Sequence, residues 1–449
     1  MFYFIGIMQL LLLSIFMFKG YKKQGFSILG DSIKLMFILW LANIGLYNLQ
    51  LSKLYNPNWQ INIIVLLICL VFFVASKKIY LKEEDILANI EEIKGNKEDY
   101  YIYSIITTLI FIIASIVFWM NIKKYGLAIF SENKINKQQI DHYAGYIVYM
   151  LVLCAQFKYI LFRTNKKIID GIIFILSLGT LVLTLNRGPL SFIVLAIYIY
   201  ELFNLVKIKK EISKKKLYAI YAILILTLIG FLQVFGYIGD MRMEYVLENV
   251  FNRTIQEHYQ MSENLPSGFL WSYVYLTSPL ENASFSLINQ SVQFTYFSKL
   301  FYPFIKLGAN LLGMGAGYKG WIMGREAYTP YLQKKVGLNA SSFIPEAMQD
   351  LGYLGVIIYV AIFLALAYFG IALIKKKIKF SALGSMIIYV NILNILVWSV
   401  FVNSLKIPVL ILNILIIIFI EFLRKKGVFK WLLKKIKKDK KILKEDSYE

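Results

Sequence analysis

The sequence predicts an all-α, polytopic membrane protein with about eleven transmembrane helices and one long external loop. Hydrophobic residues make up 58% of its 449 residues and charged residues only 17%, a balance outside that of soluble globular proteins. Apolar runs of roughly 20 residues, long enough to cross the hydrocarbon core, recur along the whole chain. The predicted spans begin near Phe2, Leu35, Ile61, Tyr100, Tyr143, Ile168, Leu190, Leu217, Met348, Ser381 and Pro408.

These runs divide the chain into four parts. About eight N-terminal spans occupy 1–235, a long external loop with short helices occupies 236–347, and about three further spans occupy 348–423. A basic tail, 424–449, follows. The first apolar run lacks a basic leading region and a small-residue cleavage site, so we interpret it as a span and not as a signal peptide.

The distribution of lysine and arginine predicts the orientation. Positive residues collect in cytoplasmic loops. With the N-terminus outside and the C-terminus in the cytoplasm, the long loop 236–347 lies outside. The net charge of +22 is then mainly topological and does not indicate a nucleic-acid partner. The inner segments 19–34, 77–99, 163–167, 207–216, 375–379 and 424–449 together hold 33 of the 49 Lys and Arg residues.

The basic tail is expected to form an amphipathic helix on the anionic inner leaflet of the bilayer. Few ionisable residues lie inside the spans. Lys158, Asp170 and Glu201 are near predicted inner ends, where we expect them to reach headgroups or solvent. Because ion-coupled transporters place acids deep in the bundle, this scarcity argues against a transporter.

Cysteine and histidine are too rare to indicate metal chemistry or a disulfide framework. Cys69 and Cys154 fall in separate spans and are expected to be packing residues. His142 and His258 are the only histidines, which argues against a zinc centre. We therefore predict no metal and no cofactor.

A tight external turn, 186–189, opens one of the spans with Asn-Arg-Gly-Pro. Proline suits the start of a helix and glycine lets the backbone bend. Two interpretations of Arg187 stay open. It is either an interfacial anchor, or a guanidinium that grips a phosphate bidentately at the membrane surface.

The start of the long loop predicts a helix over 236–259. Arg242 and Arg253 are eleven residues apart, close to three helical turns, so both would lie on one face. One interpretation is a solvated surface helix in which Arg253 pairs with Glu257. The other is a cationic face that recognises anions, with His258 as a general base.

Aromatic and small polar residues are interleaved over 271–282, and Tyr328 and Tyr331 follow later. Aromatic faces beside hydroxyls and amides suit sugars, so Tyr273 is a candidate sugar-binding residue. The alternative is an interfacial aromatic belt.

The loop closes with the string Asn339-Ala-Ser-Ser-Phe-Ile-Pro-Glu-Ala-Met-Gln-Asp-Leu-Gly-Tyr-Leu-Gly355. Its first residues, including Ser341 and Ser342, are good helix caps. Glu346 and Asp350 are four apart, so a helix would place both on one face. Glu346 is a candidate general base, and Asp350 is the lesser candidate because it could lie on the helix surface.

These outer-side motifs, taken in order, resemble those of the bacterial O-antigen polymerases, the Wzy-type oligosaccharide repeat-unit polymerases. The resemblance covers about residues 180–360 and the general pattern of spans. It rests on Asn186-Arg187-Gly188, Gly236-Tyr-Ile-Gly-Asp-Met-Arg242, Gly313-Met-Gly-Ala-Gly317 and the exit from Ala340 to Gly355. The glycine-rich stretch is expected to be a flexible turn, since no strand precedes it as in a nucleotide-binding loop.

The resemblance implies a membrane glycosyltransferase that joins undecaprenyl-diphosphate-linked glycans at the outer face of the bacterial cytoplasmic membrane, without sugar nucleotide or obligatory metal. The product would be O-antigen lipopolysaccharide or capsule. Partners would include a chain-length regulator and a flippase. By position, Arg187 and Arg242 would bind the donor diphosphate, with Arg253 or Arg325 assisting.

Three alternatives stay open beside the polymerase. The related O-antigen ligases carry a histidine where this chain has Asn339, which weakens that assignment and leaves the general base between Glu346 and His258. A transferase using polyprenyl-phosphate sugars would have acidic pairs in its first outer loop, and 52–60 contains no acid. A lipid-linked oligosaccharide flippase would instead line an internal cavity with cations.

Overall fold

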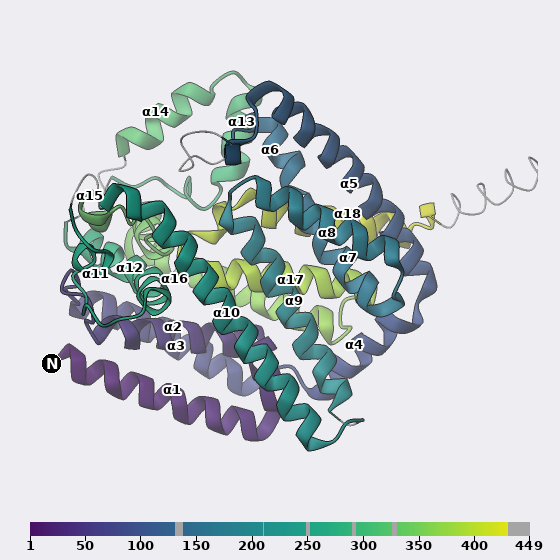
Figure 1. The fold of residues 1–449 in the computed structure, drawn as a ribbon, viewed down its shortest axis with the longest axis horizontal. Coiled ribbons are helices and arrows are strands. Elements are labelled where there is room, and N and C mark those ends of the chain that lie inside the picture. Colours follow the sequence, from purple (N-terminus) through teal and green to yellow (C-terminus); the bar gives the residue numbers. More distant parts are fainter. Residues whose placement is uncertain (131–137, 210, 248–251, 290–292, 326–329, 430–449) are drawn as a thin grey trace, which may run out of the picture.

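The computed structural model describes residues 1–130, 138–209, 211–247, 252–289, 293–325 and 330–429. The protein is 80% helical, and these residues form no strand, so the all-α class is confirmed. The helices pack into a bundle crossed diagonally by the long helix α10 (Figure 1). The main helices are α1 (Phe2–Gln24), α2 (Ser32–Asn48), α3 (Trp59–Lys78), α4 (Glu83–Gly95), α5 (Lys97–Tyr125), α6 (His142–Tyr149), α7 (Leu151–Asn165), α8 (Ile168–Leu183), α9 (Arg187–Ile208), α10 (Lys214–Val246), α11 (Ile255–His258), α12 (Ser267–Asn289), α13 (Tyr302–Leu311), α14 (Gly315–Arg325), α15 (Tyr331–Val336), α16 (Ile344–Ile374), α17 (Ala382–Trp398) and α18 (Pro408–Lys425).

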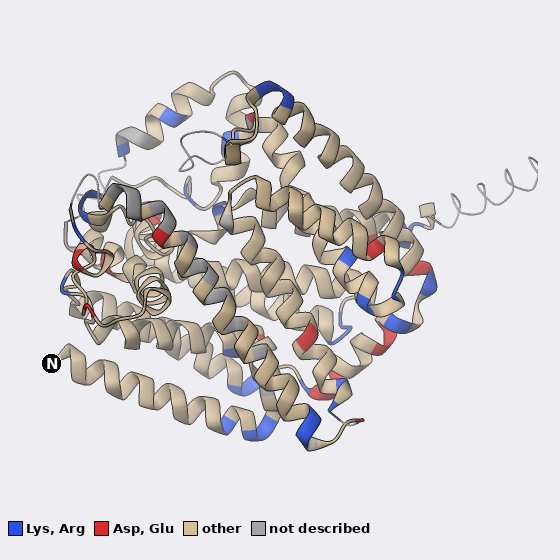
Figure 2. Cartoon of the chain, in the orientation of Figure 1, with Lys and Arg blue, Asp and Glu red and all other residues tan. Residues whose placement is uncertain are grey.

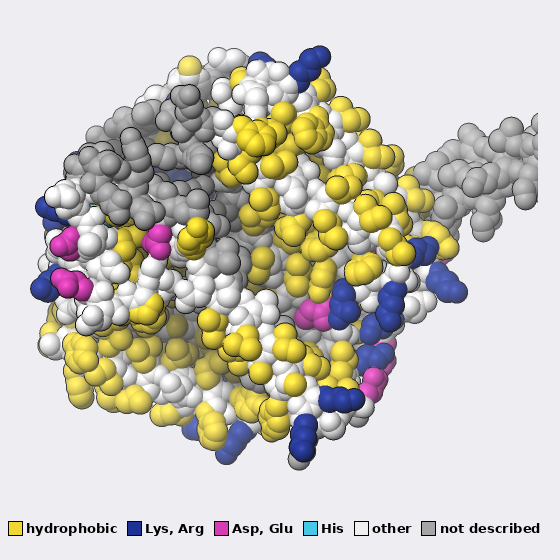
Figure 3. All heavy atoms as spheres, viewed as in Figure 1, with side chains coloured by type: hydrophobic (Ala, Val, Ile, Leu, Met, Phe, Trp, Pro, Cys, Tyr) yellow, Lys and Arg dark blue, Asp and Glu magenta, His cyan; other side chains and the backbone are white. Residues whose placement is uncertain are grey.

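Apolar side chains cover much of the outside of this bundle (Figure 3). In a soluble protein such a surface would be a liability, whereas lipid tails solvate it. Three shorter apolar helices, Ser32–Asn48, Ile168–Leu183 and Ala382–Trp398, accompany the long ones. Among the helices of the described ranges, six are long and apolar enough to cross a membrane: Phe2–Gln24, Trp59–Lys78, Lys97–Phe130, Tyr143–Asn165, Gly188–Ile208 and Ile344–Ile374.

Two helices form the centre of the bundle. α2 and α17 are apolar on every side and are buried along almost their whole length. A helix without a polar face is stable only when other helices or lipid surround it. α2 packs against α1, α3, α12, α16 and α17, so it joins the N-terminal helices to the loop segment and to the C-terminal helices.

The connecting segments gather at two opposite ends of the bundle. At one end, ion pairs join Glu83 to Lys209 and Glu92 to Lys376. Many Lys and Arg residues lie along this end, at the lower and right-hand edge of Figure 2. We call it the lysine face. At the other end, which we call the loop face, 49–58 and 399–407 contact the segment 236–347.

The predicted helix over 236–259 is interrupted, so the prediction that Arg242 and Arg253 share a helical face is wrong. α10 ends at Val246, and Asn252, with a positive φ of 49°, leaves helical geometry before the four-residue helix α11. Glu257 caps this short helix by accepting the Thr254 N–H at 2.7 Å. The predicted amphipathic tail beyond Phe429 lies outside the described residues.

Candidate functional site at the kink of α16

A kink near the start of α16 organises the loop face. Leu351 (φ −151°) and Gly352 (φ 61°, ψ −146°) leave helical geometry, so α16 is two helices joined at an angle. Carbonyl groups just before the kink lose their helical partners. The Gln349 and Asp350 carbonyls accept the N–H groups of Thr295 and Tyr296 at 2.9 and 3.2 Å. The kink therefore docks the loop segment 293–301 onto α16.

Asp350 is the centre of this docking. Its carboxylate is fully buried and accepts hydrogen bonds from the Thr295 hydroxyl at 2.6 Å and the Tyr359 hydroxyl at 2.7 Å. It also accepts the backbone N–H groups of Lys299 and Leu300 at 3.1 and 3.0 Å. Four donors compensate for the desolvation of a carboxylate. The expectation that Asp350 could lie on the helix surface is wrong, because the kink turns it into the protein.

Glu346 lies one helical turn before Asp350 and is only partly buried. Its Oε1 atom is 2.5 Å from Lys406 Nζ, and its Oε2 atom accepts the Asn403 amide at 2.9 Å. The Asn403 amide also reaches the Tyr359 hydroxyl at 3.4 Å, which links Glu346 to the Asp350 cluster. The two acids of one predicted motif thus take different environments. Glu346 faces the loop surface with a cation, and Asp350 is enclosed.

A row of aromatic side chains and cations continues from Lys406 across α13 and α14. The Nζ atoms of Lys406 and Lys306 lie 5.5 and 5.6 Å from the centroid of the Tyr302 ring. The centroid of Tyr318 follows 6.2 Å further on, and that of Trp321 another 6.3 Å away. Cations over aromatic faces at these distances are attracted to the ring quadrupole. We call these residues the aromatic row.

Arg325 ends the row. Its guanidinium lies 4.6 Å from the centroid of Trp321 and donates to the Phe294 carbonyl at 2.9 Å. The Arg325 carbonyl accepts the Gln349 side-chain amide at 2.7 Å, which ties the end of α14 to the start of α16. The predicted flexible turn around 313–320 is only partly right. Gly313 has a positive φ of 71°, but α14 begins at Gly315.

This arrangement suits an anionic ligand with sugar attached. Among the described residues of the cluster, the cations Lys306, Arg325 and Lys406 outnumber the partly exposed acid Glu346. Guanidinium and ammonium groups bind phosphate by charge-assisted hydrogen bonds. Aromatic faces and hydroxyls nearby can pack against the C–H faces of sugars. The cluster is therefore the best candidate site on the loop face.

The predicted base His258 lies in a different part of the loop face. It packs against the ring of Tyr259, with centroids 5.0 Å apart, and a hydrogen bond connects it to the backbone of Val336. Burial, and secondarily the charge of the exposed Arg253, lowers its pKa below the usual value, while the Val336 bond opposes this. A neutral imidazole can accept a proton. Glu346 and His258 thus belong to separate clusters.

Tyr273 is buried inside the packing of the loop segment. Its ring stacks on Tyr55, with centroids 5.8 Å apart, and its hydroxyl accepts the Leu51 N–H at 2.9 Å. Only 2% of the residue is exposed, so it offers no open face to a sugar in this conformation. Its role here is to hold the segment 49–58 against α12.

Asn339 is exposed, and the residues beside it are held by Asn282, which sequence reasoning did not single out. The Asn282 amide donates to the Leu338 carbonyl at 3.0 Å and to the Ala340 carbonyl at 2.7 Å. Its side-chain oxygen accepts the Leu332 N–H at 2.8 Å. An amide with both donors and its acceptor engaged fixes the segment that leads into α16.

The motif Gly236-Tyr-Ile-Gly-Asp240 serves helix packing. A Cβ atom on Gly236 would lie 2.7 Å from the Cα atom of Gly268, and one on Gly239 would lie 2.5 Å from the ring of Trp271. Asp240 accepts the Trp271 indole N–H at 2.6 Å. Small residues let helices approach closely in membrane proteins. These contacts explain the glycines as part of the α10–α12 interface.

The side chains of Arg187 and Arg242 lie outside the described part of the structure. The backbone places Arg187 at the first position of α9, where the Asn186 side chain caps the helix by accepting the Gly188 N–H at 3.4 Å. Arg242 lies in the last two turns of α10. Their assignment to a diphosphate therefore stays a prediction.

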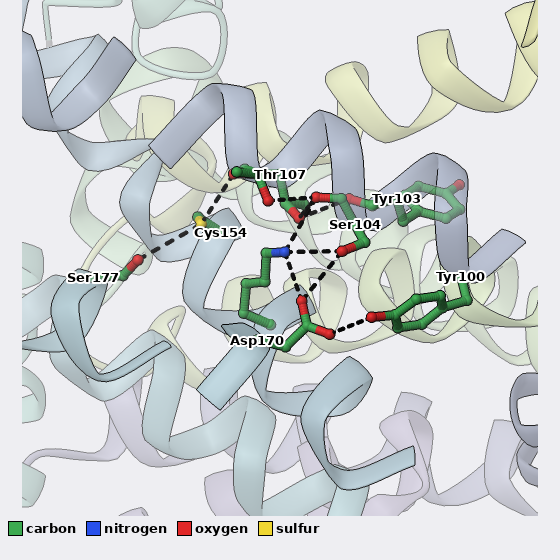
Figure 4. Close-up of polar contacts among 9 residues, drawn as sticks. Tyr100, Tyr103, Ser104, Thr107, Cys154, Asp170 and Ser177 are labelled. Carbon is green, nitrogen blue, oxygen red and sulfur yellow. Dashed lines mark hydrogen bonds and ion pairs between the residues drawn. The ribbon is translucent and has the colours of Figure 1, made fainter. Parts of the chain in front are cut away.

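A second ionisable cluster lies between α5, α7 and α8 (Figure 4). Lys158 Nζ is 2.7 Å from Asp170 Oδ1, and both side chains are 0% exposed. Lys158 also donates to the hydroxyl and the carbonyl of Ser104 at 3.1 Å, and Tyr100 donates to Asp170 Oδ2 at 2.7 Å. The expectation that both charges reach headgroups or solvent is wrong, because α5 covers them.

The most informative missed residues are Asn403 and Lys406. They follow α17 by only a few residues, and they complete the environment of Glu346 across about 60 positions of sequence. Lys406 was recognisable only as one of the few cations in a short outer segment. Comparison with models of known protein families, with curated proteins and with solved structures finds no match to this chain.

Proposed function

We propose that this chain is a membrane glycosyltransferase of the O-antigen polymerase type, with eleven crossings and the loop face outside. It would join undecaprenyl-diphosphate-linked oligosaccharide repeat units at the outer face of the bacterial cytoplasmic membrane. The observation that carries the proposal is the cluster at the kink of α16. There, an acid–cation pair, Glu346–Lys406, borders the aromatic row and Arg325 on the face that holds the long loop.

In this scheme the donor diphosphate is held by cations. The bond between the anomeric carbon of the donor sugar and its diphosphate oxygen breaks, and the electron pair leaves with undecaprenyl diphosphate. Lys406, Lys306 and Arg325 stabilise the charge that develops there, an effect worth about 10²–10³ in rate for one well-placed donor. Arg187 and Arg242 are proposed to add to this anion site.

Glu346 is the proposed general base. An acceptor hydroxyl oxygen bonds to the anomeric carbon, and its proton passes to the carboxylate. Lys406 pairs with Glu346 Oε1. A bound diphosphate competes for Lys406 and so releases a carboxylate oxygen for the acceptor. This coupling would make the base available only when the donor is present. General-base catalysis contributes typically 10²–10⁴ in rate.

Surface glycans of a strain that lacks the gene test the proposal. The strain is complemented at equal expression with wild type, Glu346→Gln, Lys406→Met, Arg187→Ala or Arg242→Ala. Lys53→Met serves as the matched control, since Lys53 is an exposed lysine of another loop-face segment. A ladder restored by wild type and the control, and collapsed to single capped repeat units by Glu346→Gln and Lys406→Met, supports polymerisation at the kink.

Other outcomes point elsewhere. Loss of even the single capped unit in the deletion strain indicates export or ligation, and retention of lipid-linked units on the inner leaflet indicates a flippase. A normal ladder with both Glu346→Gln and Lys406→Met contradicts the site. A normal ladder with Arg187→Ala and Arg242→Ala makes those two arginines interfacial anchors.

A further inference from the structure

A groove on the lysine face lies between the ends of α3 and α16. Its volume is about 180 Å³, and it is lined by Lys78 and Ile79 on one side and by Tyr368, Ile371 and the lysines after α16 on the other. α3 and α16 both pack against α2. The groove belongs to the opposite end of the bundle from the kink cluster, so it requires its own explanation.

Cations converge on this groove without a matching number of acids. Lys78, Lys375 and Lys377 line it, and no acidic residue is among its described lining. The adjacent ring of Tyr80 has three lysines near it: the Nζ atoms of Lys34, Lys23 and Lys375 lie 4.7, 5.3 and 5.8 Å from its centroid. Asp31 acts electrostatically on Lys34, and Asp85 pairs with Lys375. The remaining like charges repel one another unless a further anion joins them.

The turn that ends α16 places lysines beside the groove and holds one of them in an unfavourable backbone conformation. Lys376 has a positive φ of 55°, in the left-handed region usually taken by glycine at this position. The N–H of Lys376 bonds to the Leu373 carbonyl and that of Lys377 to the Ala372 carbonyl, both at 3.0 Å, as in a Schellman motif. The Lys376 side chain pairs with Glu92 at 2.5 Å. That anchor holds the turn with Lys375 and Lys377 beside the groove.

One lysine of the groove has a weak acidic partner. Asp85 is 3.8 Å from Lys375, a distance at the outer limit of an ion pair, and the two side chains are 25% and 22% exposed. Within the described ranges, Lys78 and Lys377 have no ion pair with an acidic side chain. The groove therefore carries an uncompensated positive charge.

Exposed apolar side chains lie on the two helices that form the groove. Leu70 and Val74 on α3 are exposed at one flank, and Tyr368 on α16, 44% exposed, lies at the other. These side chains belong to the apolar outside of the bundle, which hydrocarbon chains cover. An occupant must therefore join an anionic group at the lysines to apolar chains along α3 and α16. A free phosphate satisfies only the first requirement.

We propose that this groove is a binding site for the headgroup of an anionic phospholipid. The phosphate would lie among Lys78, Lys375 and Lys377, and the acyl chains would run along the exposed sides of α3 and α16. The orientation predicted from the sequence assigns this face to the cytoplasmic leaflet, which is rich in anionic lipid, and basic pockets between helices on that side bind such headgroups. The site is independent of the proposed glycosyl transfer.

Native mass spectrometry of the full chain in neutral detergent tests the proposal. The protein is mixed with phosphatidylglycerol, with phosphatidylcholine or with inorganic phosphate alone. The test variant is Lys78→Gln/Lys377→Gln. The matched control is Lys19→Gln/Lys97→Gln, which removes two exposed lysines of inner segments outside the groove. Elution volume and unfolding midpoint in phosphatidylcholine verify that each variant is folded.

We expect wild type and the control to retain phosphatidylglycerol in preference to phosphatidylcholine. The test variant should lose affinity for phosphatidylglycerol by about fivefold for each lysine removed, so by about 25-fold in total. Three results would overturn the proposal: unchanged retention in the test variant, an equal loss in the control, or displacement of phosphatidylglycerol by inorganic phosphate alone at millimolar concentration. The last result would make the groove a site for soluble anions.

Discussion

The buried pair Lys158–Asp170 gives a sharp prediction about stability. Lys158→Met keeps an unbranched side chain of similar length and removes the charge. It leaves the Asp170 carboxylate fully buried, and the donors that remain to it in the described part of the chain are Tyr100 at 2.7 Å and Ser104 at 3.2 Å. The double variant Lys158→Met/Asp170→Asn removes both charges and keeps an acceptor for Tyr100.

The magnitude follows from the burial of both partners. Removing one partner of a buried ion pair costs about 3–5 kcal/mol, because the remaining charge is neither solvated nor paired. Removing both charges takes away the desolvation cost as well as the attraction, and is often close to neutral. We therefore expect Lys158→Met to lower the free energy of unfolding by about 3–5 kcal/mol. The double variant should recover at least about 2 kcal/mol of that loss.

Reversible unfolding in mixed micelles, followed by circular dichroism, measures these free energies. Arg163→Met is the matched control, because the Arg163–Glu201 pair joins neighbouring helices but its arginine is 41% exposed. Glu201 is 17% exposed and keeps hydrogen bonds from Tyr159 and Asn204 in this variant, so we expect a smaller loss than for Lys158→Met. A loss below about 1 kcal/mol for Lys158→Met, or a double variant less stable than Lys158→Met, would refute the account of a closed, mutually compensating pair.

Three further predictions concern the loop face. Gly355→Ala would place a Cβ atom 1.9 Å from the Ala347 carbonyl oxygen, so we expect the free energy of unfolding in micelles to fall by about 1–3 kcal/mol. The control Gly308→Ala adds a Cβ atom in open space and should be neutral or stabilising. Asp350→Ala should free the segment 293–301, seen as faster backbone amide exchange there while α17 stays protected, and unchanged exchange would contradict the docking role. Glu281 lies in α12, where burial raises the pKa of its carboxyl group. The folded state therefore holds the proton of Glu281 more tightly than the unfolded state does. The stability that this proton contributes is complete below the usual glutamate pKa and is lost as pH rises through the raised pKa. The unfolding midpoint of wild type should therefore fall over this pH window. A pH curve of the same shape in Glu281→Gln would contradict this assignment.

The overall class of this protein follows from its sequence because hydrocarbon imposes a simple rule. A segment that crosses a membrane must satisfy its own backbone hydrogen bonds and expose apolar side chains, so helices of about 20 apolar residues recur in the sequence. The interval 236–347 was set apart because it lacks a spanning hydrophobic run, although α10 continues across its predicted start to Val246. The start of α16 was also recognisable, from the string that carries Glu346 and Asp350.

Spacing along one helix could not separate those two acids. A helix of regular geometry predicts that residues four apart share a face, but the kink at Leu351 and Gly352 encloses Asp350 and leaves Glu346 beside Lys406. The same limit applied to 236–259, where the non-helical backbone of Asn252 separates two arginines that a continuous helix would align. Local periodicity does not predict where a helix stops or bends.

Partners distant in sequence were decided only by tertiary structure. Lys158 and Asp170 lie in adjacent helices, and what makes them buried is the third helix, α5, which brings Ser104 and Tyr100 over them. Glu346 meets Lys406 because the segment after α17 returns to the loop face. Hydrophobicity is a property of each segment alone and can be summed along the chain. The pairing of a charge depends on which helices surround it, and packing of the whole bundle determines that.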